Sequence, residues 1–362
     1  MTKLVAAVSP HGFGHAARSA ALLEALGGLR PGLEIELWTT IPEWFFRESL
    51  SVPFAWRPHR LDVGLVQGGP LAEDLPATAR ALAELWTPGA ARRLAAQLRE
   101  AGAACLVADV APLALEAARH AGVPAVLVEN FTWDWIYEGY VGSEPRLEPW
   151  IERLRQCFDS AALRIQAEPV CVPRPGATRV GPIARRPRAG RAAVRRRLGI
   201  APGREMVLVS FGGFARRFRN LDRWNRIDRA VDFVVPGASE REERDGKLIL
   251  LPHRSPVHHP DLVGAADAVV GKLGYSTVAE MAAAGTRVAY VRRPSFRESE
   301  VLERWVAARL PAIELTEEQL DGGGWLERLL PLLDRPRPGP PPPGPTGAEQ
   351  AARAVAELLD SL

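Results

Sequence analysis

A strand, a turn and a helix follow one another between residues 267 and 285, and this pattern limits the folds open to the chain more than any other feature. The run Asp267-Ala268-Val269-Val270 predicts a buried strand, and Gly271-Lys272-Leu273-Gly274 supplies glycines for a tight turn. Residues 275–284 are rich in alanine and predict a helix. The sequence therefore predicts an α/β unit with its turn at the carboxyl end of a strand.

The start of this helix is suited to binding an anion. Its first N–H groups have no partner within the helix and lie at the positive end of the helix dipole. Lys272 adds a positive charge on the turn, and we expect Ser276 or Thr277 to cap the helix. Glu280, one turn after Ser276, can accept hydrogen bonds from the hydroxyls of a ribose. Diphosphate and ribose together indicate a nucleotide. The alternative is an ordinary strand–turn–helix connection without a ligand, in which the same residue spacing leaves Glu280 in solvent.

Strands and helices alternate along the rest of the chain in two blocks. Expected strands cover residues 4–8, 33–38, 105–109, 123–128, 206–211, 231–235, 247–251, 267–270 and 289–292, and residues 61–67 are expected to be a strand end that runs into a loop. Expected helices cover 16–26, 77–101, 112–120, 149–160, 191–198, 275–284, 298–309 and 349–362. The aromatic segment 131–140 is expected to be a loop. This alternation predicts an α/β fold with two Rossmann-like, doubly wound domains. The domains are expected at residues 1–172 and 191–334, with a linker at 173–190, a Pro/Gly-rich linker at 335–347 and a final helix at 348–362.

Composition narrows the class of protein. The chain has 362 residues, with 47% hydrophobic and 25% charged residues, as in ordinary globular proteins, and its net charge of +3 argues neither for nor against nucleic acid.

Arginine runs between residues 185 and 219 are expected to be solvated, or to contact phosphates of a donor or of an anionic membrane surface. The three cysteines form no Cys-x-x-Cys pair, so neither disulfides nor a zinc site is expected. The sequence has neither a signal segment nor an apolar run of about 20 residues, so we expect a cytoplasmic protein. We expect no nucleic-acid partner.

Five segments carry a resemblance to a known family. They are His11-Gly12-Phe13-Gly14-His15-Ala16, residues 130–137, Phe211-Gly212-Gly213, residues 271–280 and Val291-Arg292-Arg293. In this order the chain resembles GT-B glycosyltransferases, and it resembles still more closely the N-terminal, glycosyltransferase-like half of plant L-arabinokinases. No kinase-type segment follows, so we expect the kinase half to be absent. The resemblance implies the GT-B fold, in which two Rossmann-like domains face a cleft and a C-terminal helix crosses back onto the first domain.

The resemblance also implies a nucleotide-diphosphate sugar as donor, with UDP as the expected nucleotide and no further cofactor. Lys272 stands where plant glucosyltransferases have a diphosphate-binding histidine. The residues expected to bind the donor nucleotide are Gly14, Gly212, Gly213, Lys272, Gly274, Ser276, Thr277 and Glu280. Arg293 and Glu298 are expected to contact the donor sugar, whose identity stays open because the Asp-Gln pair of the plant enzymes is absent.

His15 is the residue expected to act as general base. Sugar transfer removes a proton from the acceptor hydroxyl, and histidine side chains titrate near neutral pH. Asp109 ends a strand of the same sheet and is expected to orient the imidazole, as in the His–Asp dyad of plant glucosyltransferases, which implies an inverting transfer. His11 is the second candidate for the base. The structural alternatives are that His15 caps its helix or contacts a loop, and that Asp109 caps the helix after it.

Loops of the first domain are expected to contact the acceptor, because aromatic rings combined with carboxylates suit polyhydroxylated molecules. The residues concerned are His11, Asp62, Gln67, Asn130, Trp133 and Asp134, together with Tyr137. Tryptophan and tyrosine side chains also pack protein cores, which is the alternative here.

Two other functions remain open. Arg18 completes a Gly-His-x-x-Arg pattern that resembles the UDP-sugar hydrolase of pseudaminic acid biosynthesis, which has the same fold and uses water as acceptor. A non-catalytic module that binds nucleotide sugars would share the fold without the chemistry. Metal-dependent transfer is disfavoured, because no Asp-x-Asp motif occurs and His253, His258 and His259 have no carboxylate partner at a suitable spacing.

Overall fold

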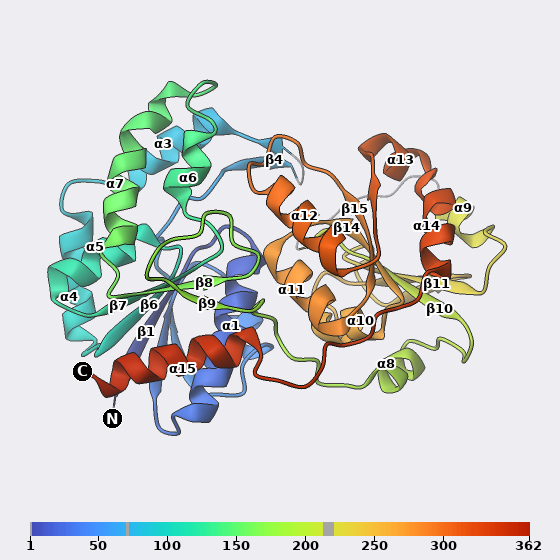
Figure 1. The fold of residues 1–362 in the computed structure, drawn as a ribbon, viewed down its shortest axis with the longest axis horizontal. Coiled ribbons are helices and arrows are strands. Elements are labelled where there is room, and N and C mark those ends of the chain that lie inside the picture. Colours follow the sequence, from blue (N-terminus) through green and yellow to red (C-terminus); the bar gives the residue numbers. More distant parts are fainter. Residues whose placement is uncertain (1, 70–71, 213–220) are drawn as a thin grey trace. The chain divides into compact units, whose positions relative to one another are not determined.

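The computed structural model describes residues 2–69, 72–212 and 221–362, which form two compact units (Figure 1). Unit 1 comprises Met1–Ala184 and Gly344–Leu362, and unit 2 comprises Arg185–Pro343. Each unit contains a 7-stranded sheet, so the prediction of an α/β fold with two Rossmann-like domains is confirmed. Across the described residues, none of the helices combines the length and the apolar character needed to cross a bilayer.

The described strands of the unit 1 sheet are all parallel, in the order β3-β2-β1-β6-β7-β8-β9. They are β1 (Lys3–Val8), β2 (Glu34–Trp38), β3 (Phe54–Arg57), β6 (Cys105–Asp109), β7 (Ala125–Glu129), β8 (Leu163–Ala167) and β9 (Thr178–Val180). Every residue of β6 and β7 is buried, which explains why these central strands are apolar runs without alternation. Val8 of β1 lies opposite Asp109 of β6, so the two strands end side by side.

The final helix of the chain belongs to unit 1. The helices of this unit are α1 (Phe13–Leu29), α2 (Glu43–Arg47), α3 (Leu75–Leu85), α4 (Ala90–Glu100), α5 (Pro112–Ala121), α6 (Trp133–Glu138), α7 (Glu148–Asp159) and α15 (Gly347–Asp360), with a 3-10 turn at Pro145–Leu147. Figure 1 shows α15 beside α1, and its Ala351, Ala352 and Val355 are part of the unit 1 core. A capping box of Thr346 and Glu349 fixes the start of α15. The prediction that the last helix crosses back onto the first domain is confirmed.

The unit 2 sheet has the order β12-β13-β11-β10-β14-β15-β16, and among its described strands β12 alone is antiparallel to its neighbour. The strands are β10 (Glu205–Val209), β11 (Val231–Pro236), β12 (Glu243–Asp245), β13 (Leu248–Leu251), β14 (Ala268–Lys272), β15 (Arg287–Val291) and β16 (Ala312–Leu315). The helices are α8 (Arg191–Arg197), α9 (Leu221–Asn225), α10 (His259–Ala265), α11 (Tyr275–Ala284), α12 (Ser299–Arg309), α13 (Glu317–Gly322) and α14 (Trp325–Asp334). Val209 of β10 lies opposite Val270 of β14, so the loops after both strands lie at the same carboxyl edge.

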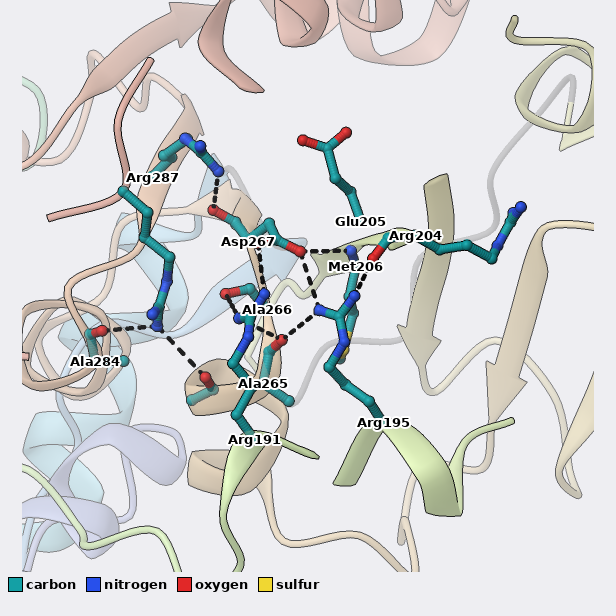
Figure 2. A network of polar contacts seen from close by, with 12 residues as sticks. Arg191, Arg195, Arg204, Glu205, Met206, Ala265, Ala266, Asp267, Ala284 and Arg287 are labelled. Carbon is teal, nitrogen blue, oxygen red and sulfur yellow. Dashed lines mark hydrogen bonds and ion pairs between the residues drawn. The ribbon is translucent and has the colours of Figure 1, made fainter. Parts of the chain in front are cut away.

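Asp267, directly before β14, is the centre of a polar network at the amino end of the unit 2 sheet (Figure 2). Its carboxylate accepts hydrogen bonds from Arg191 at 2.5 Å, from Arg195 at 3.0 Å and from the Met206 backbone N–H at 2.8 Å. Arg191 also donates to the Ala265 carbonyl at the end of α10, at 2.8 Å, where a cation offsets the helix dipole. This part of the arginine-rich segment therefore fixes α8 to the sheet and is not the solvated face that the sequence predicts.

Three predicted elements differ in the structure. The helix expected over residues 77–101 is two helices, because Pro88 and Gly89 interrupt it and Gly89, with φ 77°, precedes α4. Residues 61–66, where the end of a strand is expected, form a loop up to β4 (Gln67–Gly69), which pairs with β5 (Ala72–Glu73). The expected aromatic loop contains helix α6.

Candidate active site

The carboxyl ends of β1 and β6 hold the expected His–Asp pair of unit 1. His15 lies in the first turn of α1, and Asp109 is the last residue of β6. His15 Nδ1 is 2.7 Å from Asp109 Oδ1, and only 8% and 2% of the two side chains are exposed. Neither residue is a helix cap, because the N-caps of α1 and α5 are Gly12 and Ala111. The structure thus brings together the two residues that the sequence singles out as base and orienting carboxylate.

Several donors surround the carboxylate of Asp109. Arg18 donates to both of its oxygens, at 2.8 Å from Nε and 2.5 Å from Nη2, and Ser19 Oγ donates at 3.0 Å. Burial opposes the ionisation of Asp109, but the charge and hydrogen bonds of Arg18, with those of His15, outweigh it and hold its pKa at about 2. An ionised carboxylate only accepts hydrogen bonds, so His15 Nδ1 carries the proton and Nε2 has the lone pair that a general base needs.

The backbone is strained directly after Asp109. Val110 has φ 49°, a region that β-branched residues rarely occupy, and its side chain is fully buried. Strained residues of this kind gather at functional sites, where the surrounding structure must stabilise them. The strain is therefore a second, independent sign that the end of β6 serves a function.

Asp62 and Trp133 form a buried cluster beside His15. Asp62 Oδ2 accepts hydrogen bonds from Ser9 Oγ at 2.6 Å and from Trp133 Nε1 at 2.7 Å, and the Trp133 ring lies 6.2 Å from the His15 ring. Burial raises the pKa of Asp62 against the opposing hydrogen bond from Ser9. Only 2% of Asp62 and 1% of Trp133 are exposed, so both side chains are buried, and their expected contact with an acceptor stays a prediction. Helix α6 carries Trp133 into the core, where the two residues frame His15.

Three further residues of the expected acceptor loop are buried as well. Asn130 accepts a hydrogen bond from Arg18 and donates to the Ala167 carbonyl at 2.6 Å, so it supports the arginine that holds Asp109. Tyr137 donates to the Gly64 carbonyl at 2.7 Å, and Asp134 lies 3.6 Å from Arg155. These side chains are buried around His15, and their expected contact with an acceptor stays a prediction.

His11 and Gln67 are the expected acceptor residues that stay partly exposed. Gln67 Nε2 lies 3.3 Å from His11 Nε2, and the His11 ring stands edge-on to the Trp133 ring at 5.0 Å. The His11 ring is 6.3 Å from the His15 ring. These two side chains therefore lie on the accessible side of the buried cluster, next to the His15–Asp109 pair.

In unit 2 the turn between β14 and α11 packs against the end of β10. A Cβ on Gly271 would lie 1.9 Å from the Ser210 carbonyl oxygen, so only glycine fits there. Gly274 is the N-cap of α11, and no side chain caps this helix. Ser276 and Thr277 lie inside its first turn, so the prediction that one of them caps the helix is wrong. A Cβ on Gly274 would meet nothing within 4 Å, which leaves the turn accessible to a ligand.

The glycines expected to contact the donor nucleotide lie in different places. Gly212, after β10, has φ 58°, and a Cβ there would lie 3.9 Å from Lys272 Cε, so this loop adjoins the β14 turn. Gly14 lies in the first turn of α1, in unit 1. Gly213 lies outside the described residues.

Glu280 is buried and ionised, with 4% of its surface exposed, so the alternative of a solvated Glu280 is wrong. Its Oε1 accepts a hydrogen bond from Arg185 Nε at 3.0 Å, and its Oε2 lies 2.8 Å from His259 Nδ1. Burial opposes ionisation, but Arg185 and His259 outweigh it and hold the pKa of Glu280 at about 2. Sequence reasoning missed both partners, which are 95 and 21 residues away and follow no local spacing. His259 thus has a carboxylate partner after all, and Arg185 is not part of a solvated run.

Lys272 and Arg293 supply positive charge near the start of α11. Burial and the nearby Arg293 lower the pKa of Lys272 to about 7, against the opposing charge of Glu298. Arg293 donates to the Leu273 carbonyl at 3.1 Å and lies 3.4 Å from Glu298, and both charged residues are buried. An anion bound at this turn would favour the charged form of Lys272.

The two units thus carry different chemistry. Unit 1 offers a proton acceptor at His15 Nε2, and unit 2 offers cationic groups and a helix N-terminus suited to phosphates. In the part of the chain that the structure describes, no three His, Cys, Asp or Glu side chains lie close enough together to hold a metal ion.

Three relatives match the chain in sequence, although no family model does. It is 30% identical over 342 residues to the L-arabinokinase of Arabidopsis thaliana, a match of 90% of the chain and 32% of that protein. The chain therefore spans about a third of the length of this relative. It is 28% identical over 290 residues to an uncharacterized glycosyltransferase of Methanopyrus kandleri, a match of 73% of the chain and 78% of that protein.

Solved structures match the chain over almost its whole length. The spinosyn forosaminyltransferase has a TM-score of 0.65 at 14% identity, with 99% of each chain covered. The UGT89C1 protein of Arabidopsis thaliana, solved in complex with UDP, has a TM-score of 0.63 at 12% identity, again with 99% of each chain covered. The chain therefore has the GT-B glycosyltransferase fold, as the sequence resemblance implies.

Proposed function

We propose that this GT-B chain is a glycosyltransferase that moves a sugar from a nucleotide-diphosphate sugar, with UDP as the favoured nucleotide, to an acceptor hydroxyl. One observation carries this conclusion: His15 Nδ1 lies 2.7 Å from an oxygen of Asp109, a carboxylate that Arg18 also contacts. We infer that the neutral imidazole carries its proton on Nδ1. That tautomer leaves Nε2 to take the proton of an attacking hydroxyl. The similarity in sequence to a glycosyltransferase, and in fold to a protein that binds UDP, supports the choice of reaction and nucleotide.

In the proposed reaction the acceptor oxygen attacks the anomeric carbon while the bond from that carbon to the diphosphate breaks. His15 Nε2 takes the hydroxyl proton, and Asp109 stabilises the imidazolium that forms. The diphosphate leaves with the electron pair of the broken bond. Attack from the face opposite the leaving group inverts the configuration of the sugar. His11 and Gln67 are the partly exposed side chains that we assign to the acceptor.

We assign donor binding to unit 2. The N–H groups at the start of α11 and the ammonium group of Lys272 would stabilise the diphosphate as its charge grows, without a metal ion. The Glu280 carboxylate has acceptor sites beyond those used by Arg185 and His259, and these would hold the ribose hydroxyls. Arg293 and Glu298 would contact the sugar.

A nucleotide-sugar hydrolase is the second candidate, and the burial of the α6 region favours it. Asn130, Trp133 and Asp134 are buried, and the Trp133 N–H is already bonded to Asp62. The Gly-His-x-x-Arg segment places Arg18 on Asp109, which prepares His15 equally well to activate water.

Nucleotide release from a panel of nucleotide sugars separates these functions. A transferase should release nucleotide slowly alone and faster when a cell extract supplies the acceptor, because water is a poor substitute for the acceptor in its site. Rapid release in buffer that the extract does not change would favour the hydrolase. Nucleotide binding without any turnover would favour a non-catalytic module.

A further inference from the structure

A hydrogen-bonded chain links Ser210, His259 and Glu280 in unit 2. His259 Nε2 lies 3.2 Å from Ser210 Oγ, and His259 Nδ1 lies 2.8 Å from Glu280 Oε2. Ser210 follows β10, His259 begins α10 and Glu280 lies in α11. Ser210 also packs against Gly271, at the end of β14. The chain therefore connects the proposed diphosphate turn to the carboxylate proposed to hold the ribose.

The ionised state of Glu280 determines where the protons of this chain lie. Its oxygen can only accept, so His259 Nδ1 carries a proton and donates to it. In a neutral imidazole Nε2 is then an acceptor, and the Ser210 hydroxyl donates to it. Phosphate oxygens also accept hydrogen bonds, so a diphosphate bound beside the Ser210 backbone would compete with His259 for the hydroxyl proton of Ser210.

We propose, on the basis of the proposed donor site, that His259 takes up a proton when the diphosphate of a nucleotide binds. The proton comes from solvent and adds to Nε2, which then donates to Ser210 Oγ. The Ser210 hydroxyl turns its own proton to a phosphate oxygen. His259 becomes a cation between Glu280 and the diphosphate, and it acts as a positioning residue that adjusts the donor site to the charge of its ligand. A nucleoside without phosphates causes no such proton uptake.

Charged groups surround His259 on several elements. Glu280 on α11 contacts His259 Nδ1, and Arg185, before α8, contacts Glu280 in turn. Arg188 and Asp261 act on the neighbouring His258, and Lys272 lies at the end of β14. Glu280 is the charged group in direct contact with the His259 ring. Lys272 also gains a proton near an anion, since its pKa is about 7, so a test must separate the two residues.

Calorimetric titration in buffers of different ionisation enthalpy counts the protons taken up on binding. UDP and uridine serve as probes between pH 6.5 and 8.5. His259→Asn keeps a donor near the position of Nδ1 but cannot become a cation. His258→Asn is the matched control, because neither ring nitrogen of His258 makes a hydrogen bond in the described structure.

We expect UDP to drive more proton uptake in the wild type and in His258→Asn than in His259→Asn, with a difference approaching one proton. Lys272 contributes equally to all three. The affinity advantage of the wild type over His259→Asn should grow toward lower pH, by up to about tenfold per pH unit for one linked proton. Equal uptake in the wild type and His259→Asn would overturn the coupling. Equal uptake with UDP and uridine would overturn it too.

Nitrogen NMR spectra of the histidine rings give a second readout that needs no nucleotide. The ring whose signals disappear in His259→Asn should show the Nδ1–H tautomer in the free protein, and an Nε2–H tautomer would contradict the coupling. If neither UDP nor dTDP, GDP or ADP binds the wild type, the donor site itself is refuted, and the proton coupling falls with it. Binding of UDP with unchanged proton uptake in His259→Asn refutes the coupling alone.

Discussion

Lys272 is a residue whose charge the folded protein disfavours. Burial and Arg293 lower its pKa to about 7 from the ordinary value of 10.5, which applies to the unfolded chain. Unfolding therefore takes up a proton between pH 7 and 10.5, so the free energy of unfolding rises with pH across this window. Below pH 7 the lysine is protonated in both states, and its destabilising effect is complete.

Lys272→Met should accordingly raise the free energy of unfolding at pH 6 and flatten its rise toward pH 10. The same variant should bind UDP about tenfold more weakly or worse, because a hydrogen bond to a charged group is worth about 1.5–3 kcal/mol. Urea denaturation at several pH values and a UDP titration check both effects. A less stable variant with wild-type UDP affinity would show that Lys272 is a structural cation.

Glu280 gives a second prediction at the same scale. Glu280→Gln should weaken UDP binding by about 1–3 kcal/mol, because the amide loses the charge-assisted contacts to the ribose hydroxyls. A UDP analogue that lacks the ribose hydroxyls but keeps the diphosphate is the internal control, and the variant should lose less affinity for it than for UDP. Identical UDP titration curves for variant and wild type would remove Glu280 from the donor site.

At the scale of elements, the turn from β14 to α11 depends on two glycines for different reasons. Gly271→Ala forces its Cβ to within 1.9 Å of the Ser210 carbonyl oxygen, so we expect a loss of about 1–3 kcal/mol or more in unfolding free energy. Gly274→Ala is the matched control, since its Cβ meets nothing within 4 Å. It should fold with a loss below about 1 kcal/mol but bind UDP less well, because the methyl group intrudes on the ligand. Thermal denaturation that ranks the two variants in the opposite order would contradict this account of the turn.

The elements that the sequence predicts well are those whose own residues determine them. β6, β10 and β14 are apolar runs between glycines and helical segments, and the sheet buries them as expected. β9 and β16 are short outer strands at the ends of the two sheets, and they take their conformation from pairing with β8 and β15. Helix α6 has six residues, too few to show a period, and depends on tertiary contacts such as that of Trp133 with Asp62.

The candidate site divides in the same way. The His15–Asp109 pair was predictable because parallel strands bring their carboxyl ends to one edge of a sheet. The pairing of Glu280 with Arg185 and His259 was not, since it joins segments that no local pattern relates. Burial was also hidden from the sequence, which is why Trp133 was assigned to an acceptor surface although it fills the core.

At the scale of the whole molecule, α15 completes the core of unit 1 from the far end of the chain. Ala352 is fully buried there, so Ala352→Asp would place an unpaired charge in the core and should cost several kcal/mol of unfolding free energy. Arg353→Asp, at the neighbouring exposed position, is the control and should be nearly neutral. Chemical denaturation followed by tryptophan fluorescence measures both. Equal stability of the two variants would mean that α15 does not pack on unit 1 in solution.

The central claim is that His15, oriented by Asp109, removes the acceptor proton during sugar transfer. The most direct test is nucleotide release by His15→Ala with saturating nucleotide sugar and acceptor extract, combined with UDP affinity for the same variant. We predict a loss of about 10²–10⁴ in turnover, the usual contribution of a general base, and a UDP affinity close to that of the wild type, because the proposed donor groups belong to unit 2. Turnover at the wild-type rate in His15→Ala would contradict the claim.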